Sequence, residues 1–168
     1  MNAGNNTLTL TYRRARADDR DAVLHVLAFA NFHHVPTPEM PELTLEKFYV
    51  AELGGQVVGC AGYKVLADGC GKTTLMAVDP TYRGLGIGQR LQELRMIEMR
   101  SLGCSVVITN ADRPETIDWY KRKFGYREIG TLKKLHEFGH PAIDCWTTLE
   151  ADIERWYREL YITAPGAR

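Results

Sequence analysis

Hydrophobic and polar residues alternate in some segments of the chain and recur every three to four residues in others, which predicts both strands and helices. Alternation or a short apolar run predicts strands in seven segments: residues 8–15, 47–53, 56–66, 72–78, 104–110, 126–135 and 143–150. Helical spacing predicts helices in four: residues 18–34, the second half of 79–103, 113–124 and 151–160. The order of these elements predicts a layered α/β domain of the mixed α+β kind.

The composition fits one globular domain without a strong net charge. Of 168 residues, 45% are hydrophobic and 25% charged, and 21 Lys and Arg balance 21 Asp and Glu. We therefore expect a single domain over residues 1–168, flexible at 1–6 and 163–168, with no field to attract nucleic acid or an anionic membrane. Four singly placed cysteines, no apolar run of ~20 residues and no signal-peptide pattern predict a soluble, cytoplasmic protein.

Residues 136–140 read HEFGH, which matches the H-E-x-x-H signature of zinc peptidases. The signature binds zinc on a helix, because the i,i+4 spacing aims both imidazoles at one metal. Gly139 is a poor helix former, and Pro141 disfavours helical backbone at His140. A third ligand would have to be one of three glutamates that follow no pattern: Glu150, Glu154 and Glu159. We interpret the stretch as a polar connection between two strands and expect no metal; a zinc hydrolase is a remote alternative.

A glycine-rich turn, RGLGIG at residues 83–88, precedes the second predicted helix. Gly84, Gly86 and Gly88 let the backbone approach a ligand closely, and the free N–H groups at a helix N-terminus favour a phosphate. The turn is not a Walker A loop, since no Lys-Ser/Thr follows, and its third glycine comes one residue early for a dinucleotide fingerprint. It predicts a binding site for an anion.

Other residues stand at fixed places around this turn. Val78 ends the preceding strand, and Asn110, Tyr120 and the pair Gly125-Tyr126 follow about one helix and one strand later. In these positions the sequence resembles the GCN5-related N-acetyltransferase (GNAT) family. That family has R/Q-x-x-G-x-G/A a few residues after a strand-ending valine, then an asparagine, then a helix with a tyrosine before Gly-Phe/Tyr. The resemblance covers about residues 8 to 134.

The resemblance implies a fold, a co-substrate and its binding residues. The fold is a single GNAT-like domain, a central, mostly antiparallel sheet with a splayed strand pair, flanked by helices. The co-substrate is acetyl-CoA, with its pyrophosphate on the backbone N–H groups of the turn and its pantetheine arm between the splayed strands. The implied binding residues are Met76, Val78, Arg83, Gly84, Leu85, Gly86, Ile87, Gly88 and Asn110.

Direct acetyl transfer needs a neutral amine and a proton for the departing thiolate. Tyr120 matches the family's usual general acid, and a tyrosine phenol is protonated at neutral pH; packing in the core is its alternative role. The base departs from the family pattern, because Lys72 stands about where many members have a glutamate, and residues 72–78 contain no acid. The amine could lose its proton in two other ways. Ordered water could lead the proton to a distant base, or the substrate could be an α-amino group with a pKa of ~7.7–8.0, which is partly neutral unaided.

Acceptor specificity in the family comes from the first helix, the loop after it and the late strands. His33 and His34 lie in that region and are candidates to bind the acceptor or act as base, although such a pair also suits a helix end. His136 and His140 are either acceptor contacts or ordinary turn residues. Homodimers are common among the proteins that the chain resembles, so a homodimer is a candidate assembly.

We therefore expect an acetyl-CoA-dependent N-acetyltransferase that transfers acetyl directly to a primary amine of a small-molecule or amino-acid-like acceptor. The missing strand acid suggests an alternative of another class, a catalytically silent acyl-CoA-binding regulatory module. The sequence leaves the acceptor, the acyl chain and the base open.

Overall fold

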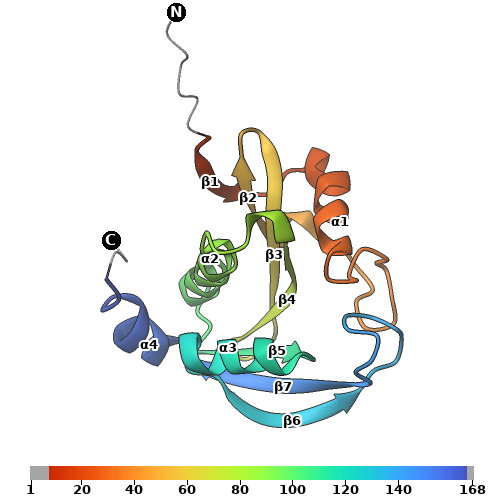
Figure 1. Ribbon diagram of the computed structural model, residues 1–168. Helices are drawn as coiled ribbons and strands as arrows, with labels where there is room; N and C mark the ends of the chain where they lie inside the picture. The colour runs from red at the N-terminus through yellow and green to blue at the C-terminus, as the bar shows by residue number, and fades with distance from the viewer. Residues whose placement is uncertain (1–7, 166–168) are drawn as a thin grey trace, which may run out of the picture.

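The structure, a computed structural model, describes residues 8–165 (Figure 1). Its strands and helices are β1 (Leu10–Arg14), α1 (Arg20–Ala28), β2 (Phe48–Leu53), β3 (Gln56–Val65), β4 (Cys70–Val78), α2 (Ile87–Ser101), β5 (Val106–Ala111), α3 (Pro114–Phe124), β6 (Arg127–Lys133), β7 (Cys145–Asp152) and α4 (Ile153–Trp156). The end predicted to be flexible at 1–6 lies outside the described residues. Of the predicted tail 163–168, the structure describes 163–165, which form turns.

Within residues 8–165, seven strands form one sheet in the order β1-β2-β3-β4-β5-β7-β6. Neighbouring strands are antiparallel except β4 and β5, which are parallel. A tight turn at Gly54-Gly55 joins β2 to β3, whereas the parallel pair needs a long crossover, which α2 provides. The predicted fold, a mixed α/β domain with a mostly antiparallel sheet, is confirmed.

Helices cover both faces of the β1–β4 half of the sheet. α1 packs with Val23 over Val50 on one face, and α2 packs with Ile87 over Ala51 on the other. Val50 and Ala51 are neighbours in β2, so their side chains point to opposite faces, as strand geometry requires. Figure 1 shows α1 and α2 on opposite sides of β3. The sheet is therefore the middle of three layers in this half.

The β5–β7 half is covered by α3, α4 and the last turns of α2. Their shared core contains Met96 of α2, Phe124 of α3, Trp156 of α4 and Leu149 of β7, all buried. No helix within residues 8–165 is long and apolar enough to cross a membrane.

The first helix ends earlier than the predicted 18–34. α1 stops at Ala28, and Asn31 follows in a left-handed conformation (φ 58°). The Phe32 N–H donates to the Leu27 carbonyl (2.9 Å) and the Asn31 N–H to the Ala28 carbonyl (3.1 Å), which is the Schellman ending of a helix. The prediction that His33 and His34 end this helix was wrong, because both follow it in a loop.

The last helix begins later than the predicted 151–160. Ala151 and Asp152 continue β7 and pair with Val107 and Val106 of β5. The Asp152 carboxylate then accepts the Arg155 N–H at 2.9 Å, so α4 begins at Ile153. The strand extends because its partner β5 offers two more residues to pair with, which a pattern within one segment cannot show.

Candidate functional site

The parallel strands β4 and β5 separate after a short stretch of pairing. Within the described chain, Cys70–Lys72 pair with Val106–Ile108, and beyond them each strand pairs only with its other neighbour. The Thr73 and Thr109 hydroxyls bond to each other at 2.5 Å just past the last pair. A β-bulge in β4 opposite Gly62 bends the strand at this point. The sheet therefore opens into a wedge between β4 and β5.

The backbone of β4 presents unpaired groups to this opening. The Asp79 N–H donates to the Val58 carbonyl (2.8 Å), so Asp79 and Ala77 face β3 in the antiparallel ladder. Because backbone direction alternates along a strand, the N–H and C=O groups of Met76 and Val78 point the other way. No strand in the described part of the chain pairs with them there. The structure thus places both residues where a ligand in the wedge meets their backbone.

β4 leads into the glycine turn, whose backbone donors are free. Gly84 (φ 82°) and Gly86 (φ 74°) are left-handed, and Gly86 precedes the first residue of α2. A Cβ added at either would meet no atom within 4 Å, so the space beside the turn is open. Among the described residues, no acceptor binds the N–H groups of residues 84–89. Free donors at the N-terminus of a 15-residue helix fit a diphosphate.

Two cavities follow the wedge and meet. One of about 510 Å³ lies over the glycine turn and is lined by Gly84, Gly86, Gly88 and Trp119. The other, of about 420 Å³, is the cleft between β4 and β5, lined by Asn110 and Tyr120 among others. Both are also lined by a shared set of residues: Met76, Val78, Arg83, Glu115 and Thr116. A long ligand can therefore extend from the turn into the cleft.

Asn110 and Tyr120 each keep a hydrogen-bond donor for the cleft. The Asn110 Oδ1 accepts from the Thr148 hydroxyl (2.8 Å), which leaves the amide N–H groups to a ligand. The Tyr120 hydroxyl accepts from the Arg95 Nη2 (3.0 Å), and in residues 8–165 its own O–H has no acceptor. Its ring is buried, with 4% of its surface exposed. The sequence-predicted residues of the β4, turn and α3 segments thus line two adjoining cavities, except Leu85, which lines neither.

The far end of the cleft is aromatic, and the sequence assigned none of its Phe and Trp residues to the site, although His140 was a candidate acceptor contact. Phe29 and Phe32 after α1, and Trp146 of β7, line it together with His140. Phe32 and Trp146 both contact the buried Phe138 ring, at centroid distances of 4.8 and 6.2 Å. The available signal was the aromatic content of two segments far apart in the chain, whose proximity only the fold reveals.

The HEFGH stretch lies in the loop between β6 and β7, without helical structure. Gly139 adopts φ 78°, and the Asn31 side chain donates to its carbonyl at 2.9 Å. The His140 Nδ1 lies 3.1 Å from the Ala142 N–H, which it accepts, so the neutral ring carries its proton on Nε2. No cluster of three or more His, Cys, Asp or Glu suited to a metal occurs in residues 8–165.

His33 and His34, the predicted acceptor-binding pair, lie outside the residues that line the cleft. The His34 Nε2 is 3.1 Å from the Glu137 carbonyl, and its ring contacts the His136 ring at a centroid distance of 5.5 Å. The Glu39 carboxylate accepts the His136 N–H at 2.8 Å. These contacts join the loop after α1 to the loop between β6 and β7, so the pair connects two loops beside the cleft.

Lys72 lies at the closed end of the wedge. It pairs with Lys64 of β3 and with Ile108 of β5, next to the Thr73–Thr109 hydrogen bond. Burial, and then the charge of Lys64, lower the pKa of Lys72. β4 thus carries an ammonium and no carboxylate along the wedge.

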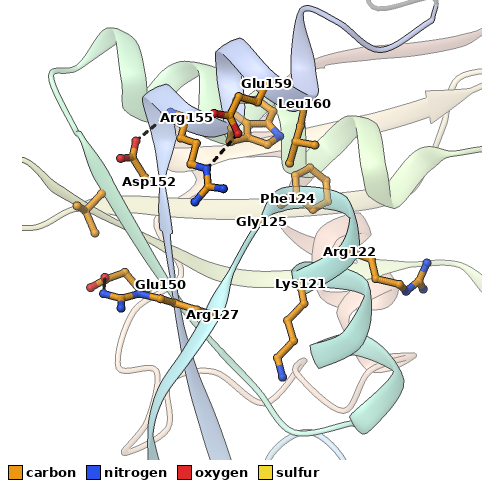
Figure 2. A pocket seen from close by; sticks show the side chains of 12 residues that line it. Lys121, Arg122, Phe124, Gly125, Arg127, Glu150, Asp152, Arg155, Glu159 and Leu160 are labelled. Atoms are coloured by element: carbon orange, nitrogen blue, oxygen red, sulfur yellow. Dashed lines mark hydrogen bonds and ion pairs between the residues drawn. The ribbon is translucent and has the colours of Figure 1, made fainter.

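A further hollow of the surface lies away from the wedge. It has a volume of about 620 Å³ and lies between the end of α3, the strands β6 and β7, and α4 (Figure 2). Most of its charged side chains already have partners, such as Arg127 with Glu150 (2.8 Å) and Arg155 with Glu159 (3.0 Å) inside the hollow, and Lys121 with Glu128 (2.7 Å) outside it. The wedge, with its free backbone donors, is therefore the better candidate for a ligand site.

Comparison with known proteins agrees with this geometry. The family model of the GNAT acetyltransferase domain matches residues 44–128, which include β2 to α3 and the glycine turn. The chain belongs to the GNAT acetyltransferase family.

Individual relatives resemble the chain in sequence or in fold. An amino-acid acetyltransferase of Pseudomonas putida is 31% identical over 86 residues, which are 51% of this chain and 19% of that protein. The chain thus spans about a fifth of the length of this relative. The N-acetylglutamate synthase of Neisseria gonorrhoeae, solved with coenzyme A and N-acetyl-glutamate, has a TM-score of 0.67 at 19% identity over 86% of this chain and 35% of that one. The ribosomal-protein-S18-alanine N-acetyltransferase of Escherichia coli has a TM-score of 0.67 at 18% identity, over 86% of this chain and 94% of that one. These two structures share the fold.

Proposed function

We propose that the protein is an acetyl-CoA-dependent N-acetyltransferase acting on a primary amine of a small-molecule or amino-acid-like acceptor, with its single acetyltransferase domain in residues 1–168. The observation that carries the proposal is the continuous path from the free N–H groups of residues 84–89 into the wedge between β4 and β5. It offers donors for a diphosphate, then unpaired strand backbone for an extended amide arm, then a donor at the end. Acetyl-CoA has the matching parts in the same order: a diphosphate, a pantetheine arm with amide groups, and a thioester.

Different groups of the chain bind different parts of acetyl-CoA along this path. The N–H groups of the turn hold the pyrophosphate, with Arg83 beside it. The backbone of Met76 and Val78 and the amide of Asn110 bind the pantetheine arm and orient the acetyl carbonyl. Acetyl-CoA supplies an activated thioester carbon.

Tyr120 provides the proton that the departing sulfur needs. The amine nitrogen forms a bond to the acetyl carbon, the carbon–sulfur bond breaks with its electron pair on sulfur, and the Tyr120 O–H proton passes to that sulfur. The nitrogen releases one proton to water, and the tyrosine regains one, so the products are an N-acetylamine and a free thiol. Because β4 has no carboxylate, we propose an acceptor whose amine is partly neutral near pH 7–8, such as an α-amino group.

Calorimetric titration of acetyl-CoA into the protein tests the binding half of this proposal. Gly86→Val is expected to weaken binding at least about tenfold, because a β-branched residue disfavours φ 74° and its side chain enters the phosphate space. Gly55→Val is the matched control. It has a similar backbone (φ 82°) and equally open surroundings, but lies in the β2–β3 turn. Equal affinity in both variants would show that the turn does not bind the pyrophosphate.

Turnover separates the enzyme from the silent acyl-CoA-binding module that the missing β4 acid suggests. We expect the protein to release CoA thiol in the presence of at least one amine from a panel of L-amino acids and short alkylamines. Tyr120→Phe is expected to lower kcat by roughly 10²-fold, as loss of a general acid does, and to leave acetyl-CoA affinity nearly unchanged. Stoichiometric acetyl-CoA binding with no turnover on any amine would favour the module.

A further inference from the structure

Arg95 is a cation buried in the core of the domain. It lies in α2 with 0% of its surface exposed, among buried neighbours on the same helix face such as Leu91 and Met99. Its guanidinium is held by hydrogen bonds from Nε to Gln92 Oε1 (2.6 Å) and from Nη1 to the Gly62 carbonyl (3.0 Å). The Gly62 carbonyl is available because the β4 bulge leaves Gly62 out of the pairing between β3 and β4.

No carboxylate in residues 8–165 forms a salt bridge with Arg95. The other arginines that hold α2 to its surroundings, Arg90 and Arg100, pair with Glu93 and Glu154. Among the described residues, the hydrogen-bond partners of Arg95 are all neutral. A buried cation without a counter-charge is costly, so its place on this mostly apolar helix face calls for a function.

The guanidinium lies directly behind the proposed acid. Its Nη2 donates to the Tyr120 hydroxyl at 3.0 Å and lies 3.5 Å from the Met76 Sδ, and both of these residues line the cleft. By taking a lone pair of the Tyr120 oxygen, Arg95 fixes the rotation of that hydroxyl and leaves its O–H free to donate. A further hydrogen bond, from Gln92 Nε2 to the Tyr126 hydroxyl (3.0 Å), holds Gln92 in place, and Gln92 in turn holds Arg95.

We propose that Arg95 is the positioning residue of the acid in this enzyme, and that its charge is balanced when Tyr120 gives up its proton. This inference rests on the proposed N-acetyltransferase function. As the Tyr120 O–H proton moves to the sulfur of CoA, the electron pair of the O–H bond stays on the phenolic oxygen. The negative charge then develops on the Tyr120 oxygen, 3.0 Å from the Arg95 Nη2 of a guanidinium that is already oriented and buried. A preformed charge of this kind stabilises a transition state without reorganisation.

A merely structural role makes a different prediction. If Arg95 only fills the core, its removal would lower stability and reduce activity by the same factor whether or not Tyr120 carries its hydroxyl. If Arg95 acts through the hydroxyl, its removal would matter only when the hydroxyl is present. A double-mutant cycle therefore separates the two roles.

The experiment measures kcat and KM for Arg95→Met, Tyr120→Phe and the double variant. It uses acetyl-CoA and the fastest acceptor from the panel of L-amino acids and short alkylamines. Arg95→Met is expected to lower kcat about ten- to hundredfold with KM for acetyl-CoA within about threefold, since it removes part of a general-acid contribution. In the Tyr120→Phe background the same change is expected to lower kcat less than about threefold. Arg90→Met is the matched control, because it removes a cation from the same helix without touching Tyr120.

Equal losses in both backgrounds, or an unchanged kcat for Arg95→Met, would overturn the inference while the N-acetyltransferase proposal stands. A wild-type protein without turnover would overturn both. Circular dichroism and thermal melts check that each variant folds. If Arg95→Met does not fold, the cycle is run with Arg95→Lys, which keeps the charge but not the fork of donors. A loss confined to the background with the Tyr120 hydroxyl supports the inference, and an equal loss in both contradicts it.

Discussion

Lys134 and Asp112 form a buried ion pair at the aromatic end of the cleft, and its disruption is expected to destabilise the domain. Their side chains are 6% and 10% exposed, and the Lys134 Nζ is 2.9 Å from the Asp112 Oδ2. The carboxylate also accepts the N–H groups of His140 (2.7 Å) and Arg113 (2.8 Å), while the ammonium lies 4.5 Å above the Trp146 ring. Lys134→Met leaves a buried carboxylate without its cation. We expect a loss of about 3 kcal/mol in the free energy of unfolding, the low end for a broken buried pair, because two N–H donors remain on the carboxylate.

Urea unfolding measures this loss as a shift in midpoint at constant slope. The double variant Asp112→Asn/Lys134→Met is expected to be at least about 1 kcal/mol more stable than the sum of the single losses predicts. Lys121→Met is the control, since its pair with Glu128 is exposed and its loss is expected to stay within about 0.5 kcal/mol. The same Lys134 variant is expected to raise KM for the amine, because the loop with His140 loses its anchor. A Lys134→Met midpoint within error of the wild type would refute the reasoning.

Two further perturbations test the layers around the site. The bidentate bond of Arg13 to Asp19 (2.7 and 2.9 Å) holds the pKa of Asp19 below its ordinary value, so the stability it confers is present above pH ~4 and is lost as pH falls below that. Asp19→Asn is expected to cost about 1–2 kcal/mol at pH 7 and less near pH 2, and an equal loss at both pH values in urea titrations would contradict this. At Gly59, a Cβ would come 2.8 Å from Ile87 Cγ2 and 3.1 Å from Leu91 Cδ1, so Gly59→Ala is expected to displace the first turn of α2. We expect a loss of about 1–3 kcal/mol and weaker acetyl-CoA binding, and unchanged calorimetric affinity would show that the turn tolerates the shift.

The sequence predicted the strands and the glycine turn because their signals are local. Alternation within each strand needs no knowledge of its partners, and the turn is marked by Gly84 and Gly86, which the structure holds at positive φ. The end of α1 also had a local signal in Asn31, whose residue type tolerates the left-handed conformation, but the apolar pattern continued past it.

The residues that the sequence did not predict depend on distant parts of the chain. Arg95 stands in a helix where a charged residue is assigned to solvent by default, and its burial depends on Tyr120 and on the carbonyl of Gly62. Trp146 lines the cleft because β7 pairs with β5, which forms one side of it. The periodicity of one segment cannot predict contacts between residues of distant segments.

The three tryptophans are distributed so that the molecule carries its own optical reporters. Trp119 lines the cavity over the glycine turn, Trp146 lines the aromatic end of the cleft, and Trp156 is 2% exposed in the core. Fluorescence of a variant that keeps only Trp119 would follow occupancy of the turn, and that of a variant that keeps only Trp146 would follow occupancy of the aromatic end of the cleft. The order in which two substrates enter could thus be read by stopped-flow mixing, without a label on either one.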